Sequence, residues 1–368
     1  SKVWMMENAT SYTLTFTCGS GANVAILAGE TKFIATDGGG SGGVVYDVLT
    51  DLSVNGFSND GDYKSVTAGT SNLVLGVNAG NSIASGGNYN VTVGDEAGTA
   101  ITTGDKNTFV GYVSGDATTT ANNNTAIGYG SLGANTTGAQ NTSIGKDSLT
   151  TNTTADDNTA LGYEALRANT TGASNVAVGR DALLANTTGH SNTAVGKSAG
   201  AAITTGVENV AIGFTALDAN TTGSYNTTVG TDSMGANTTG QENVAVGWNS
   251  LDANTTGANN VAIGASSLGS NTTGPGNTAV GYSSLTLNVS GEYNTAVGQA
   301  AMGANTTGDN NVAVGSGALD ANTTADNNTA VGGSALGANT TGTNNVAVGA
   351  NAADANTTGG AITAVGIN

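Results

Sequence analysis

The sequence predicts an all-β chain: a parallel β-roll or β-solenoid of 17-residue coils that follows a small N-terminal β-domain. Three observations predict this class. A glycine preceded by an aliphatic residue recurs at a fixed interval, the residues before it alternate large, small and large, and the chain holds 58 Gly but only 1 Pro. Its dense Val, Ile, Leu and Ala distinguish it from a disordered Gly-rich tail.

The interval between these glycines is the strongest of the three observations. After one step of 18 residues from Gly76 to Gly94, sixteen successive steps of 17 residues lead to Gly366. An uninterrupted period of this kind indicates a repeat architecture in which each unit packs on its neighbours. Such a short unit has room for two short strands and two turns, so each repeat is expected to form one coil. Because neighbouring strands lie roughly 4.8 Å apart, the coils predict a rod of about 80–85 Å.

Each position of the repeat, counted from this glycine as zero, has a physical role. Positions −3 to −1 follow the period-2 pattern of a strand, with a small residue at −2 and Val, Ile or Leu at −1. Leu or Met mostly occupies +4, and Asn-Thr-Thr-Gly fills +7 to +10. Glycine at zero and +10 permits the turns.

Asparagine occupies −4 in 17 of the 18 repeats, and only Ile362 replaces it. We expect the Asn side chains at −4 and +7 to stack on their own copies, one per coil, and to hydrogen-bond along the stack. The predicted ladder at −4 includes Asn124, Asn141, Asn158, Asn175, Asn192, Asn209, Asn226 and Asn243.

The chain divides into residues 1–66, which do not repeat, and the solenoid of residues 67–368. The stretches "SYTLTFTCG", "ANVAILAGETKFIATDGG" and "GVVYDVL" predict four short strands separated by Gly-rich turns. Cys18, in the first of these stretches, is expected to be a packed or turn residue.

The solenoid is expected to associate with copies of itself. A two-layered roll buries one face of its strands, and the other face would expose an aliphatic stripe much larger than soluble monomers usually show. Burial of three such stripes around a common axis predicts a homotrimer with closed symmetry. The alternative is a wider monomeric solenoid that buries both faces with the help of Leu at +4.

The repeats resemble two known groups of proteins. "NTAIGYGSLGANTTG", "NVAVGRDALLANTTG" and "NTAVGGSALGANTTG" resemble the head repeats of trimeric autotransporter adhesins, which are left-handed parallel β-rolls. They are more similar to arrays in tail fibres of marine phages and in related bacterial surface proteins. The resemblance covers about residues 71–368, and "NATSYTLTF…AGETKFIATDGG…VVYDV" resembles a small module of tailed-phage fibres. The resemblance to tail fibres implies that the chain is the extracellular shaft of a phage tail fibre, a trimer that serves virion attachment and host-surface adhesion.

Two other functions remain open. A self-assembling extracellular filament or a bacterial surface adhesin is the alternative, because the sequence stops just past Gly366 and an open coil offers unpaired backbone groups to another subunit. An ice-binding solenoid that uses the Thr columns at +8 and +9 is a minor alternative. Adjacent residues of a strand point to opposite sides, so only one column would face ice. Val289 and Ser290 also interrupt the two columns.

Charge argues against two classes of partner. The net charge is −18, and the 171 residues after Lys197 contain no Lys or Arg but ten acids. Phosphate binding depends on basic residues, so we expect no nucleic-acid partner. The chain also has no apolar stretch long enough to span a bilayer, so no membrane insertion is expected.

The sequence offers no catalytic constellation, and we expect no enzymatic activity, cofactor or metal. The single histidine, His190, stands at a variable turn position. Position +1 is the one distinctive column, which we call the ridge. It carries Lys146, Arg180 and Lys197, and its aromatic members are Tyr112, Tyr129, Tyr163, Phe214, Trp248 and Tyr282. The ridge is expected either to contact a host-surface glycan or protein receptor, or to shield a seam between coils or subunits.

Overall fold

The computed structural model describes residues 2–16, 24–28, 31–36, 45–47 and 67–367. Every regular element in these ranges is a β-strand, which confirms the all-β class. Cys18 and most of the connection before the first coil lie outside the described residues. The chain separates into two compact units, Ser1–Tyr63 and Lys64–Asn368, which are treated separately below.

The first unit contains two small antiparallel sheets. One has the strand order β1-β4-β5 and the other pairs β2 with β3. The strands are β1 (Lys2–Glu7), β2 (Leu14–Phe16), β3 (Val24–Ile26), β4 (Thr31–Thr36) and β5 (Val45–Asp47).

Among the described residues of this unit, Val24 and Ile34 form a buried cluster, and Phe16 packs against it. The buried Asn8, directly after β1, links this part of the chain to the end of β3, because its Nδ2 donates to the carbonyl of Ile26 at 2.8 Å. Strand β1 was not among the four predicted strands. Its consecutive apolar residues, Val3 to Met6, lack the alternation on which that prediction relied.

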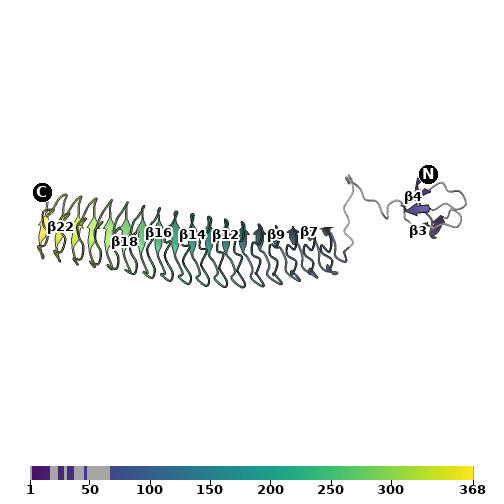
Figure 1. Cartoon of the computed structure of the whole chain (residues 1–368), viewed down its shortest axis with the longest axis horizontal. Coiled ribbons are helices and arrows are strands. Elements are labelled where there is room, and N and C mark those ends of the chain that lie inside the picture. Colours follow the sequence, from purple (N-terminus) through teal and green to yellow (C-terminus); the bar gives the residue numbers. More distant parts are fainter. Residues whose placement is uncertain (1, 17–23, 29–30, 37–44, 48–66, 368) are drawn as a thin grey trace. The chain divides into compact units, whose positions relative to one another are not determined.

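The second unit is a β-solenoid in which each coil contributes one strand to a single parallel sheet (Figure 1). Successive strands pair without a break from β6 to β23, always in the same register. The strands are β6 (Leu73–Leu75), β7 (Val91–Val93), β8 (Thr108–Val110), β9 (Thr125–Ile127), β10 (Thr142–Ile144), β11 (Thr159–Leu161), β12 (Val176–Val178), β13 (Thr193–Val195), β14 (Val210–Ile212), β15 (Thr227–Val229), β16 (Val244–Val246), β17 (Val261–Ile263), β18 (Thr278–Val280), β19 (Thr295–Val297), β20 (Val312–Val314), β21 (Thr329–Val331), β22 (Val346–Val348) and β23 (Thr363–Val365).

The remainder of each coil contains turns and bends instead of the second strand that we expected. In the coil of Gly162, for example, Glu164, Leu166 and Ser174 have positive φ values between 52° and 59°. Residues in this left-handed region turn the chain and cannot continue an extended strand. The second limb still bonds to its neighbours, because the Thr136 N–H and hydroxyl both donate to the carbonyl of Thr153 at 2.8 and 3.0 Å.

The core lies between the two limbs of each coil. Ala160 at −2 points inward and is fully buried, as is Leu166 at +4. Leu161 at −1 points to the opposite face of the sheet and is 44% exposed. The glycine at zero is required by geometry: Gly213 has φ 141°, and a Cβ there would overlap the carbonyl oxygen of Gly230 in the next coil.

Some coils replace the consensus core residues in compensating pairs. Gly200 stands at +4, where most coils have Leu, and the same coil has Ile203 at +7 in place of Asn. A Cβ on Gly200 would lie 2.9 Å from Ile203 Cδ1, so the isoleucine fills the volume that the leucine would otherwise occupy. Gly98 and Ile101 form the same pair, at 2.8 Å.

Candidate functional site

The asparagines at −4 join neighbouring coils through their backbone and side chains. Asn226 is buried, its Nδ2 donates to the carbonyl of Gly240 at 2.9 Å, and its Oδ1 accepts the backbone N–H of Asn243 at 3.1 Å. The first bond closes the coil on itself and the second joins it to the next coil. All eight predicted ladder residues are at most 1% exposed, and Asn158 alone directs its Nδ2 elsewhere, to the carbonyl of Asp156.

The asparagines at +7 form a second row through side-chain amides. Asn169 Nδ2 donates to Asn152 Oδ1 at 3.0 Å, and Asn186 Nδ2 donates to Asn169 Oδ1 at 2.9 Å. The row breaks where Ile203 replaces Asn, which leaves the buried Oδ1 of Asn186 without a partner. Both rows are buried, so they contribute to stability and offer no surface for a ligand.

The ridge, in contrast, lies on the surface beside the C-terminal ends of the strands. Neighbouring strands pair with equivalent positions opposite each other, and each ridge residue follows the glycine that ends its strand. The ridge side chains of successive coils therefore lie next to one another along the sheet. The exposed fractions of its six aromatic side chains run from 42% to 60%. Tyr112 and Tyr129 lie in ring contact, with centroids 5.6 Å apart and planes tilted by 38°.

Basic side chains intercalate between the rings of the ridge. The Lys146 ammonium lies 5.6 Å from the ring centroids of both Tyr129 and Tyr163. The Arg180 guanidinium lies 5.7 Å from the Tyr163 centroid, and Lys197 lies 5.3 Å from that of Phe214. Seven successive coils therefore supply one continuous row of aromatic and basic side chains from Tyr112 to Phe214. Contacts of this type contribute about 0.5–1 kcal/mol each at exposed sites.

Acidic side chains at +2 accompany part of this row. Lys146 pairs with Asp147 at 3.3 Å and Arg180 with Asp181 at 3.0 Å. The hydrogen bond and charge of Asp147 raise the pKa of Lys146, so that side chain stays protonated at neutral pH. A hydrogen bond to Glu164 raises the pKa of Tyr163, which keeps its phenol neutral. Trp248 and Tyr282 are separated from the row and from each other by Thr231 and Ala265.

Other candidate positions lie apart from the ridge. His190 is exposed, and its Nδ1 lies 3.3 Å from the Ser191 hydroxyl. At the Thr positions +8 and +9, Thr170 is half-buried and its hydroxyl donates to the Thr187 carbonyl at 3.0 Å, whereas Thr171 is exposed. They do not lie in a strand, so the expected alternation of adjacent Thr residues does not apply to them.

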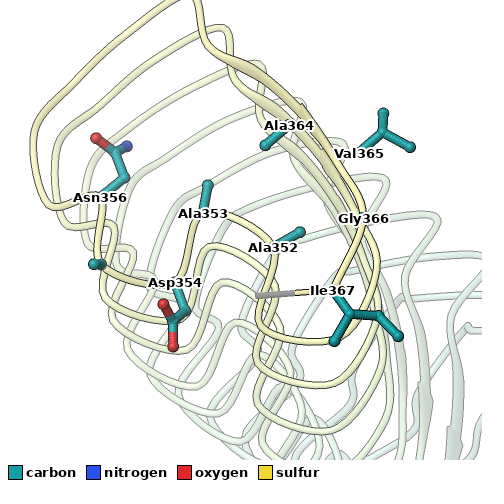
Figure 2. Close-up of a pocket in the computed structure, with 9 residues that line it drawn as sticks. Ala352, Ala353, Asp354, Asn356, Ala364, Val365, Gly366 and Ile367 are labelled. Carbon is teal, nitrogen blue, oxygen red and sulfur yellow. The ribbon is translucent and has the colours of Figure 1, made fainter.

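A hollow of about 280 Å³ lies inside the coil that ends at Ile367 (Figure 2). Ala352, Ala353 and Ala364 line it, and the small Ala353 occupies position +4, where most coils have a leucine. Nearby, Asn356 donates to Asn339 Oδ1 at 3.1 Å as part of the +7 row. The hollow is thus the uncovered end face of the last described coil, where a Cβ on Gly366 would meet no atom within 4 Å, and we assign it no ligand.

Within the described ranges, no group of three or more His, Cys, Asp or Glu side chains is placed to hold a metal ion. The same residues include no helix long and apolar enough to cross a membrane. Comparison of the chain with family models, curated proteins and solved structures found no match. Any functional assignment therefore rests on the geometry of the coils and the ridge.

Proposed function

We propose that the chain is the structural shaft of a phage tail fibre, displayed outside the cell, where it serves virion attachment to a host surface. The observation that carries this proposal is the unbroken parallel pairing of eighteen strands in one register. Each added coil extends such a stack by one strand spacing, about 4.8 Å, so repetition produces length and stiffness. The resemblance of the repeats to tail-fibre arrays supports the same function.

We also propose that three copies form the shaft. The outward face of the sheet carries Val, Ile or Leu at −1 in every coil, and several of these side chains, such as Leu161 and Ile263, are more than 40% exposed. Thr or Val at −3 lies on the same face. Burial of this uncharged stripe against two further copies around a threefold axis removes it from water without leaving an open surface.

Immunogold labelling tests the location that this function requires. Antibodies against the purified chain are applied to phage particles and to the cells that they infect, and the gold label is located by negative-stain electron microscopy. Label confined to virion tail fibres is expected. Label on the cell surface or on free filaments would contradict the tail-fibre function and support the bacterial adhesin or the self-assembling filament.

A further inference from the structure

Two cations of the ridge lie next to each other, and their like charges repel. Arg180 and Lys197 occupy +1 of neighbouring coils, after the paired strands β12 and β13. The Ser198 N–H donates to the Arg180 carbonyl at 2.9 Å, which fixes the two positions side by side. Like charges opposite each other on paired strands are destabilising. An anion bound between the two side chains would remove this repulsion.

Both cations retain hydrogen-bonding capacity toward solvent. Asp181 contacts Arg180 through Nε, so the terminal nitrogens of the guanidinium lie beyond that contact. The Arg180 side chain is 63% exposed. Lys197 forms no ion pair with any side chain that the structure describes. Exposed ion pairs are worth about 0–1 kcal/mol, so the neighbouring aspartate does not prevent a second carboxylate from binding.

The flanking rings define the shape of this surface. Tyr163 and Phe214 stand on either side of the two cations, with ring centroids at 5.7 Å from Arg180 and 5.3 Å from Lys197. Lys146 and Arg180 both lie over the Tyr163 ring, and Lys197 lies over the Phe214 ring, so these rings already contact cations. This part of the ridge therefore presents an ammonium and a planar guanidinium, which favour an acidic group over a neutral sugar face.

We propose that Tyr163, Arg180, Lys197 and Phe214 bind a carboxylate of an acidic polysaccharide whose chain lies along the ridge. The guanidinium binds the carboxylate through two parallel hydrogen bonds, and the Lys197 ammonium supplies a further charge-assisted bond. Lys146 lies two coils before Arg180, about 10 Å away. Two residues of an extended pyranose chain span a similar length, so a second carboxylate reaches Lys146. This inference rests on the attachment function proposed above and names the ligand class.

Calorimetric titration of the full chain with oligogalacturonate tests the proposal, with the methyl-esterified oligomer as a neutral ligand of the same backbone. The test variant is Arg180→Gln with Lys197→Gln. Its matched control, Lys32→Gln with Lys106→Gln, removes the same charge from strand β4 and from position −5 of one coil, both outside the ridge. We expect saturable binding of the acid form only, a Kd raised at least about tenfold in the test variant, and a change below about twofold in the control.

Three results would overturn the proposal: equal affinity for the esterified oligomer, equal weakening in both double variants, or no saturable binding by the unmodified chain. Arg180→Lys keeps the charge but removes the planar fork, so it should fall between the unmodified chain and the double variant. Circular dichroism melting shows whether each variant is folded. The immunogold result is independent of this titration, so a failed ligand and a failed tail-fibre function are distinguishable.

Discussion

The coil that contains Gly200 and Ile203 offers the sharpest test of how the solenoid core is built. It has no side chain at +4 and an isoleucine at +7, and the preceding coil holds the unpaired Oδ1 of Asn186. We consider three variants: Ile203→Asn, Gly200→Leu, and the two together. The double variant reproduces the consensus coil of the other repeats.

Each single substitution should destabilise the coil. Ile203→Asn removes a buried aliphatic side chain, which costs about 2–5 kcal/mol. A donor for Asn186 recovers about 1–3 kcal/mol of this, so the net loss is about 1–3 kcal/mol. Gly200→Leu adds a Cβ that lies 2.9 Å from Ile203 Cδ1 and 3.1 Å from Leu183 Cδ2, and such overpacking costs about 1–3 kcal/mol.

The double variant should recover most of both losses. The leucine fills the space that Ile203 vacates, and the new asparagine continues the +7 row from Asn186 toward Asn220. A left-handed leucine costs about 1–2 kcal/mol relative to glycine, which is close to the gain from the satisfied Asn186. We therefore expect a stability within about 1 kcal/mol of the unmodified chain and a coupling energy of at least about 2 kcal/mol between the two sites.

Hydrogen exchange of peptides that span Gly179 to Gly213 is the direct assay, because repeat proteins can open locally. Denaturant unfolding of the full chain provides the overall free energy. Faster exchange in both single variants and near-normal exchange in the double variant are expected. Additive losses in the double variant, or single variants as stable as the unmodified chain, would refute the compensation between +4 and +7.

Three further substitutions test other parts of the coil. Asn226→Ala removes the bonds to Gly240 and Asn243 and should lower stability by about 2–4 kcal/mol, whereas Gln241→Ala at an exposed position should change it by less than about 0.5 kcal/mol, as melting temperatures would show. Gly213→Ala should disrupt its coil by collision with the next backbone, while Gly333→Ala, whose nearest atom would lie 3.9 Å away, should be nearly neutral in the same assay. Burial and then the charge of Asp232 raise the pKa of Asp252 in the folded state. The ionised carboxylate therefore disfavours folding, and Asp252→Asn should stabilise the chain at pH 7. This gain should vanish below about pH 3.9, where the carboxyl is protonated in both the folded and the unfolded state. A constant gain across that range would contradict this assignment.

The sequence predicted the coil because its period carries information that no single repeat contains. The regular glycine spacing set the coil length, and the alternation at −3 to −1 identified the strand. The second predicted strand was wrong, because the left-handed residues in that limb, such as Glu164 and Leu166, are not types that usually signal a turn. The core around them selects this conformation, and local sequence does not reveal it.

The ridge could be located from the sequence but its internal order could not. A repeated +1 position placed Tyr163 and Phe214 on one line, yet only the structure shows that Lys146, Arg180 and Lys197 lie over the rings. Side-chain rotamers decide that geometry, and the period does not specify them. The pairing of Gly200 with Ile203 could have been found beforehand, since both depart from the consensus within one repeat, as Gly98 and Ile101 also do.

The trimeric shaft that we propose depends on burial of the exposed aliphatic face of the solenoid between three chains. Sedimentation equilibrium of the purified full chain in dilute solution measures the mass of the assembly. One chain has a mass of 35.5 kDa, so we expect a single species at three times that value, seen as discrete rods by electron microscopy. A stable species of 35.5 kDa would rule out the trimer and favour a monomeric solenoid.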